Sequence, residues 1–331
     1  MEVKNVICAA AILCSCSVAR AETLPVAGVY ASGTDMDAEI HTIAVEGFGG
    51  DAGPELSFLL TDLLAEVEIH GKNWFSIVPA ATLKNHLLGI GHIQAVDGDE
   101  AASAEDQLST VAVLSGTARS QVNDYSISPK KVKTCAKKVA KKCVEHVVEV
   151  YECRNMTVSY TPSLRIVAPN GDLLYQNSNY LEATQSYCED EDKVPDPDQM
   201  LGSLAAQYSY AARLDLAPQY RETEFRILER RNGLSKDDAR SFKDAIHLTK
   251  TDPLGACSAF GGLEASNPNQ LSVLFNIGLC REGKGDLTAA REYYLRALSV
   301  EPRRSVTQAG LERIESRIQA ERQVMDRFDL N

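Results

Sequence analysis

Cysteine is the residue type whose number and spacing most clearly allow chemistry in this chain. The sequence has nine cysteines, and Cys8, Cys14 and Cys16 fall in an apolar run near the start. The remaining six are Cys135, Cys143, Cys153, Cys188, Cys257 and Cys280. An even number in an exported chain favours disulfide bonds. There is no C-x-x-C pair and no histidine at ligand spacing, so the sequence predicts no metal site.

One turn allows a specific cysteine pair to be predicted. Asn170-Gly171 lies between two strand-like segments and is a strong signal for a two-residue hairpin loop. If Pro169 then faces Asp172, paired residue numbers sum to 341, as those of Cys153 and Cys188 do. Residues directly opposite on two strands are close to the separation that a disulfide needs. The hairpin therefore predicts a Cys153–Cys188 bridge.

Two points qualify this register. In an ideal hairpin the pair is a hydrogen-bonded one, which is less comfortable for a bridge, and Pro162 could force a bulge that shifts the pairing by one residue. With Cys153–Cys188 favoured, a Cys135–Cys143 bridge would close a short loop.

That short loop is also rich in cations. Seven lysines occur within thirteen residues, namely Lys130, Lys131, Lys133, Lys137, Lys138, Lys141 and Lys142. They could form a basic patch for anionic lipid, cell-wall polymer or an acidic partner. Equally, they could be a solvated hairpin tip that keeps the strand ends from pairing with another chain. The acidic run that starts at Glu189 and Asp190 lacks the order of a calcium loop, so we expect a solvated linker or an electrostatic partner of the lysines.

Motifs of common enzyme classes are absent. The chain contains no P-loop, no G-x-S-x-G, no H-E-x-x-H and no glycine set for a dinucleotide after a strand. Its histidines are His41, His70, His86, His92, His146 and His247, and none has a recognisable catalytic spacing. We therefore expect a non-catalytic protein without a cofactor.

The net charge and the N-terminal residues indicate the class of partner and the compartment of the protein. The 331-residue chain has a net charge of -12, which argues against nucleic acid as its general partner. Lys4, the apolar run 6–18 and Ala19-Arg20-Ala21 have the layout of a signal peptide over 1–21, cleaved after Ala21. Leu13-Cys14-Ser15-Cys16 loosely resembles a lipobox, which leaves lipidation at Cys16 open. We expect export to the periplasm, with outer-membrane association if Cys16 is acylated.

Periodicity predicts an α/β sandwich domain with a long β-hairpin, followed by an all-α domain. Residues 22–40 show little periodicity and are expected to be a leader, the α/β domain covers 41–230, and the helical domain covers 235–331. Strands are expected at 41–45, 74–78, 111–127, 144–167, 172–184 and 220–228, and helices at 54–67, 80–88 and 198–216.

The helical part contains a repeat-like motif. Residues 271–302 resemble a tetratricopeptide repeat (TPR) at Leu274, Ile277, Gly278, Gly285, Leu287, Ala290, Tyr294, Ala297 and Pro302, while Arg281 departs from the pattern. A weaker copy lies 34 residues earlier, and 303–325 would be a capping helix. Cys257 and Cys280 fall on adjacent helices, which predicts a third bridge. By this resemblance, Phe275, Asn276, Leu279 and Glu282 would line a partner-binding groove, although Leu279 could be simple core.

The first domain resembles the CsgG-like curli-secretion lipoprotein family and the N-terminal domain of TolB. The residues that carry the resemblance are 42–45, Gly49-Gly50, the leucines at 59–64, 75–79 and 113–117. It implies an α/β adaptor or assembly unit of the cell envelope and transfers no site residue.

Two functions follow as hypotheses. The first is a protein-binding scaffold of the envelope that holds envelope proteins or peptides in the repeat groove. The second is an oligomeric secretion or assembly component of the outer membrane. The lysine-rich tip argues against a lipid-inserted hairpin, because inserted strands need an apolar outer face.

Overall fold

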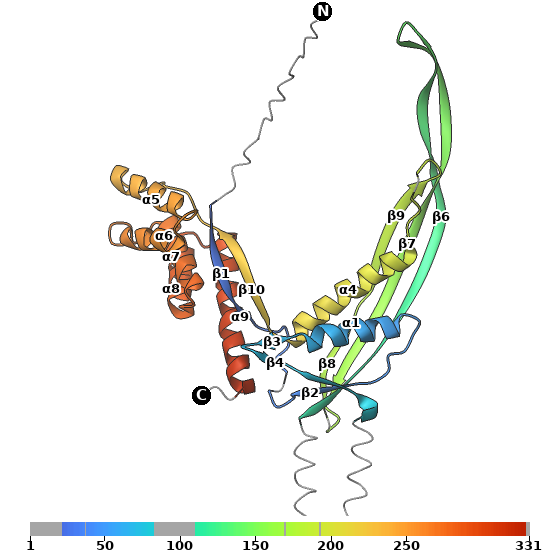
Figure 1. The fold of residues 1–331 in the computed structure, drawn as a ribbon. Coiled ribbons are helices and arrows are strands. Elements are labelled where there is room, and N and C mark those ends of the chain that lie inside the picture. Colours follow the sequence, from blue (N-terminus) through green and yellow to red (C-terminus); the bar gives the residue numbers. More distant parts are fainter. Residues whose placement is uncertain (1–21, 37, 83–109, 169, 192, 329–331) are drawn as a thin grey trace, which may run out of the picture. The chain divides into compact units, whose positions relative to one another are not determined.

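A computed structural model describes residues 22–36, 38–82, 110–168, 170–191 and 193–328 (Figure 1). The signal peptide, its cleavage site at Ala21 and the lipobox at Cys16 lie outside the described residues, as do His86 and His92. So does most of the helix expected at 80–88, of which 80–82 are helical.

The fold is mixed α/β, and the chain divides into two compact units. Unit 1 comprises residues 1–28 and 222–315, and unit 2 comprises 29–221 and 316–331. The units thus differ from the expected division at 230–235. The expected leader at 22–40 is also wrong, because it contains strand β1 (Thr23–Tyr30), which pairs with β10 (Gln219–Arg226).

Unit 2 is built on a six-stranded sheet. The order is β5-β2-β6-β7-β8, and β9 also pairs with β7. The strands are β2 (Thr42–Val45), β5 (Ser76–Pro79), β6 (Val111–Val139), β7 (Lys142–Val167), β8 (Leu173–Ser178) and β9 (Leu181–Cys188). The pairings of β2 are parallel and those of β7 antiparallel. A short hairpin of β3 (Glu68–Ile69) and β4 (Lys72–Asn73) lies between α1 and β5.

Helices α1 (Gly53–Ala65) and α4 (Pro197–Leu216) pack on this sheet (Figure 1). Pro54 lies in the first turn of α1, where backbone N–H groups have no acceptor within the helix, so its lack of an N–H costs no hydrogen bond. The Asp196 side chain caps the start of α4. The helix leucines at 56, 60 and 64 are fully buried. Alternate β7 residues such as Val158, Leu164 and Ile166 are equally buried, as expected of a sheet with one covered face.

The strand register beyond the β7–β8 turn was predicted correctly, but the length of the loop was not. The Ala168 N–H donates to the Asp172 carbonyl, so the loop between the strands is one residue longer than expected. A bulge after Ile166 restores the predicted register, and Cys153 pairs with Cys188. Pro162 causes no shift, because Tyr160 pairs with Leu181 and Ser163 with Ser178 in the same register.

Unit 1 contains four helices and the first part of α9 in its described residues. They are α5 (Lys236–Leu248), α6 (Pro253–Gly262), α7 (Leu271–Gly283), α8 (Leu287–Val300) and α9 (Ser305–Phe328). Tyr294 of α8 has no exposed surface, and a Cβ at Gly278 or Gly310 would lie 2.9 Å from its ring. These two glycines therefore allow α7 and α9 to approach Tyr294 closely.

In unit 2, the last turns of α9 are fixed by polar side chains. The Gln323 side chain bonds both the N–H and the hydroxyl of Ser32, and the Arg327 guanidinium donates to the carbonyls of Trp74 and Ile40. Helix α9 ends three residues past the expected end of the capping helix at 325, and its residues from 316 on belong to unit 2.

Candidate functional site

A two-stranded ribbon of unit 2 exposes both large apolar and charged side chains. Strand β9 ends at Cys188 opposite Cys153, while β6 and β7 continue together (Figure 1). Beyond that point, residues 130–139 and 142–151 pair with each other. We call residues 130–151 the ribbon. Because a free two-stranded hairpin is only marginally stable in water, its support at the base matters.

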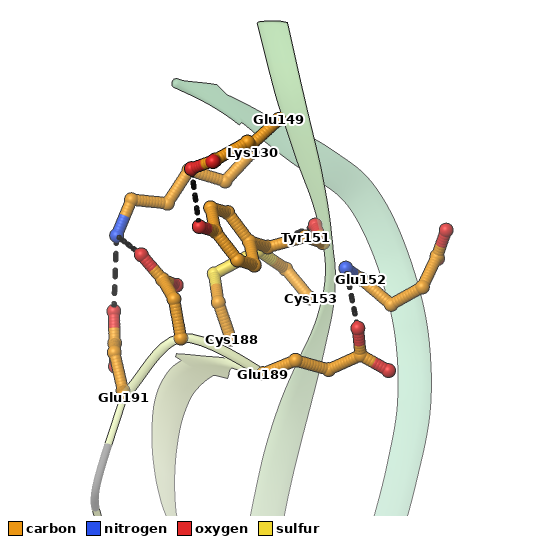
Figure 2. Close-up of polar contacts among 9 residues, drawn as sticks. Lys130, Glu149, Tyr151, Glu152, Cys153, Cys188, Glu189 and Glu191 are labelled. Atoms are coloured by element: carbon orange, nitrogen blue, oxygen red, sulfur yellow. Dashed lines mark hydrogen bonds and ion pairs between the residues drawn. A yellow bond between two sulfur atoms is a disulfide. The ribbon is translucent and has the colours of Figure 1, made fainter. Parts of the chain in front are cut away.

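The base of the ribbon is joined covalently and by backbone hydrogen bonds (Figure 2). Cys153 and Cys188 form a disulfide there. The Glu189 N–H donates to the Glu152 carbonyl at 3.0 Å, and the Glu152 N–H donates to the Glu189 carboxylate at 3.4 Å. The β6–β7 register also shifts between Ile127 and Lys130, so a bulge lies at this level.

Ion pairs surround the same base. The Lys130 ammonium lies 2.8 Å from Asp190 and 3.8 Å from Glu191, so the acidic run pairs with one of the seven lysines, at the base of the ribbon (Figure 2). The hydrogen bond to Asp190 raises the pKa of Lys130. The Tyr151 hydroxyl donates to Glu149 at 2.7 Å, and this bond raises the pKa of Tyr151.

Cys188, Asp190 and Glu191 are the group of potential metal ligands found in the described part of the chain. The Cys188 sulfur is bonded to Cys153, and the Lys130 ammonium lies against both carboxylates. A thiolate is the form that binds metal, so this group is unsuited to a metal ion.

The seven lysines of the predicted cation-rich loop extend along the ribbon from its base to its tip. All seven lysines from Lys130 to Lys142 are exposed, and Cys135 and Cys143 form the predicted disulfide between the strands. The exposed large apolar residues of the ribbon are Val139, Val144, Val147, Val148 and Val150.

Each face of the ribbon mixes charge with apolar surface. Lys131 faces Val150 and Lys133 faces Val148 across the strands, while Val132 faces Glu149. Since side chains alternate between faces, neither face offers a continuous apolar band. The arrangement does not suit the hydrocarbon of a bilayer.

These valines are functional candidates that the sequence analysis missed. A strand was expected at 144–167, but no role was assigned to its valines. Glu145, His146 and Glu149 lie between these valines and leave neither side of the strand purely apolar. This pattern could have revealed that the valines are exposed.

The expected partner-binding residues of α7 are not on the surface. Phe275, Asn276, Leu279 and Glu282 each have at most 1% of their surface exposed. Asn276 bonds the backbone of Leu228, and Glu282 accepts from Tyr294 and Arg313. The expectation of an open groove at these residues is therefore wrong, because segments of unit 1 itself cover this face.

The third predicted bridge, Cys257–Cys280, joins α6 to α7. Together the three disulfides indicate an oxidising compartment and hence export. Across the described residues, none of the helices is long and apolar enough to cross a membrane.

Neither a family model nor a curated protein matches the chain. Among solved structures, it is similar to a dodecamer of a PelC variant from Paraburkholderia phytofirmans, at 14% identity and a TM-score of 0.23. That match covers 58% of this chain and 99% of the PelC chain. A likeness with so low a TM-score carries no argument about function.

Proposed function

We propose that this protein is a non-catalytic exported component of a bacterial envelope that acts as an adaptor or scaffold, with the ribbon as its contact surface. The observation that carries the proposal is the ribbon itself. It has two strands without a third, a disulfide at each end and exposed valines among lysines.

Exposed apolar side chains in such a strand pair are a cost to an isolated protein, because they bury nothing and invite association. A partner that covers Val147, Val148 and Val150 would remove that cost. The bridges at Cys135–Cys143 and Cys153–Cys188 hold the ribbon in one shape beforehand, which reduces the entropy lost on binding.

A second candidate is an oligomeric secretion or assembly component, in line with the resemblance to CsgG-like proteins. It is favoured by the edge of β6. Within the described residues, the stretch 121–139 of β6 pairs in the sheet only with β7, so one side of its backbone is unpaired. An open edge of this length is a template for a strand of a second copy.

The test is site-specific photo-crosslinking in intact cells. A photoreactive amino acid would replace Val147, which is 46% exposed on the ribbon, or Phe58, which is 70% exposed on α1 as the matched control. Products would be identified by mass spectrometry.

Crosslinks from position 147 to a distinct envelope protein, with none from position 58, would support the adaptor. Products that contain only this chain would support the self-assembling component. If position 147 gives no product beyond that of position 58, the ribbon is not a contact surface and the adaptor proposal fails.

A further inference from the structure

The segment 226–230 of unit 1, between β10 and α5, is held by side chains of the helices around it. The Asn276 amide accepts from the Leu228 N–H at 2.8 Å and donates to the Leu228 carbonyl at 3.0 Å. The Gln270 amide donates to the Arg230 carbonyl at 3.1 Å. The backbone from 227 to 230, which follows the end of β10 at Arg226, is therefore fixed without regular secondary structure.

This segment lines a hollow of about 480 Å³ together with Arg304 and Val306. Arg226, Arg230 and Arg304 supply three positive charges to it, and Glu229 supplies one negative charge. The apolar lining comes from Ile227, Leu228 and Val306. Within a chain of net charge -12, this hollow is locally positive.

The arginines have hydrogen-bonding capacity left over. Arg226 lies 3.9 Å from Glu229 and Arg304 lies 3.9 Å from Glu301, which is too far for a strong hydrogen bond. The Nε of Arg304 is buried and has no hydrogen-bond partner in the described residues. The rest of the Arg304 side chain is not covered, since the side chain as a whole is 26% exposed, and it is open to an acceptor in the hollow.

We propose that this hollow binds an oxyanion, either a carboxylate or a phosphate, carried on an apolar chain. Guanidinium groups present paired N–H donors that match both oxyanions, and the arginine cluster would supply them from more than one side. The apolar part of the ligand would lie against Val306, the half-buried apolar residue of the lining, since Ile227 and Leu228 are only 1% and 9% exposed. This inference is independent of the ribbon.

The experiment is calorimetric titration of the full chain with four probes. Octanoate and octyl phosphate carry the two oxyanions on the same chain, acetate lacks the chain, and octyl glucoside lacks the charge. We expect saturable binding of octanoate or octyl phosphate and much weaker binding of acetate and octyl glucoside. The stronger of the two charged probes identifies the oxyanion.

Variants locate the site. Arg230→Ala and Arg304→Ala should each weaken binding by roughly tenfold or more, because each removes a charge-assisted bond. Arg304→Lys retains the charge but lacks the paired N–H donors of the guanidinium. Its affinity for the probe should lie between those of Arg304→Ala and the parent. Arg240→Ala, on α5 in a surface pair with Asp237, is the matched control and should bind like the parent.

Several results would overturn the proposal. They are equal binding of octyl glucoside, equal loss in Arg240→Ala, or no saturable binding of either charged probe. Circular dichroism of each variant would show whether it is folded. If Arg304→Ala is unfolded, Arg230→Ala and Arg304→Lys decide the outcome.

Discussion

Glu282 is a carboxylate with no exposed surface, and its environment explains how unit 1 tolerates it. It accepts from the Tyr294 hydroxyl at 2.6 Å and from two nitrogens of Arg313 at 2.9 and 2.7 Å. Burial, followed by the charge of Glu282, raises the pKa of Tyr294 well above its ordinary value, so the tyrosine remains a donor. A bidentate arginine and a neutral phenol thus satisfy the buried charge, and α7, α8 and α9 are joined at this point.

Removal of one member of this group should therefore destabilise the protein strongly. Glu282→Ala removes the carboxylate that accepts two bonds from the Arg313 side chain, which is 16% exposed, and should cost about 3–5 kcal/mol in the free energy of unfolding by urea. Glu312→Ala, at an exposed site on α9, should change it by less than about 0.5 kcal/mol. The double variant Glu282→Met with Arg313→Met should recover part of the loss. A loss below about 1 kcal/mol in Glu282→Ala would show that the network does not stabilise unit 1.

At the scale of elements, the two disulfides of the hairpin lie in different surroundings. Cys153–Cys188 joins β7 to the end of β9, next to the folded sheet. Cys135–Cys143 joins β6 to β7 where no further described strand pairs with either of them. A bridge stabilises a protein to the extent that the bridged region is ordered in the native state and free in the unfolded one. The first should therefore affect global stability and the second only the local order of the tip.

The comparison of two double variants tests this difference. Cys153→Ser with Cys188→Ser should lower the free energy of unfolding by roughly 2–4 kcal/mol and speed amide exchange in β9. Cys135→Ser with Cys143→Ser should leave that free energy within about 0.5 kcal/mol of the parent but speed trypsin cleavage after Lys137, Lys138 and Lys141. Equal losses of stability in both variants would contradict the proposed independence of the tip.

The elements also show how far sequence patterns reach. Helix α1, helix α4 and the pairing of Cys153 with Cys188 were predicted, because leucine periodicity, proline position and hairpin register are local signals. The compensating bulge after Ile166 was not, since nothing in its sequence differs from a regular strand. Strand β1 was missed because its partner β10 lies almost 190 residues later. The burial of Asn276 and Glu282 was missed because it depends on Leu228 and Arg313, which are distant in sequence from α7.

For the molecule as a whole, charge is strongly segregated. Residues 130–152 contain seven lysines and three glutamates, a formal charge of +4, which leaves -16 for the rest of the chain. In the described residues, Lys130 is the ribbon lysine with a carboxylate within 4 Å. The others are exposed, and the ribbon carries them away from the core of unit 2 (Figure 1). A basic tip on an acidic protein should orient it toward anionic surfaces over about a Debye length, roughly 8–10 Å in ordinary buffers.

Binding of the protein to an anionic matrix distinguishes a functional basic patch from a merely solvated tip. If the patch binds anions, the protein should be retained on an anionic matrix at low salt despite its net charge of -12, and should elute as salt rises. Substitution of Lys137, Lys138 and Lys141 by Gln should abolish most of that retention, because their charges act together at one place. The same substitution at Lys236, Lys243 and Lys284, which are exposed in unit 1, changes the net charge equally and should have little effect. Retention that falls equally in both triple variants, or no retention of the parent, would show that the lysines serve only to keep the ribbon soluble and unpaired.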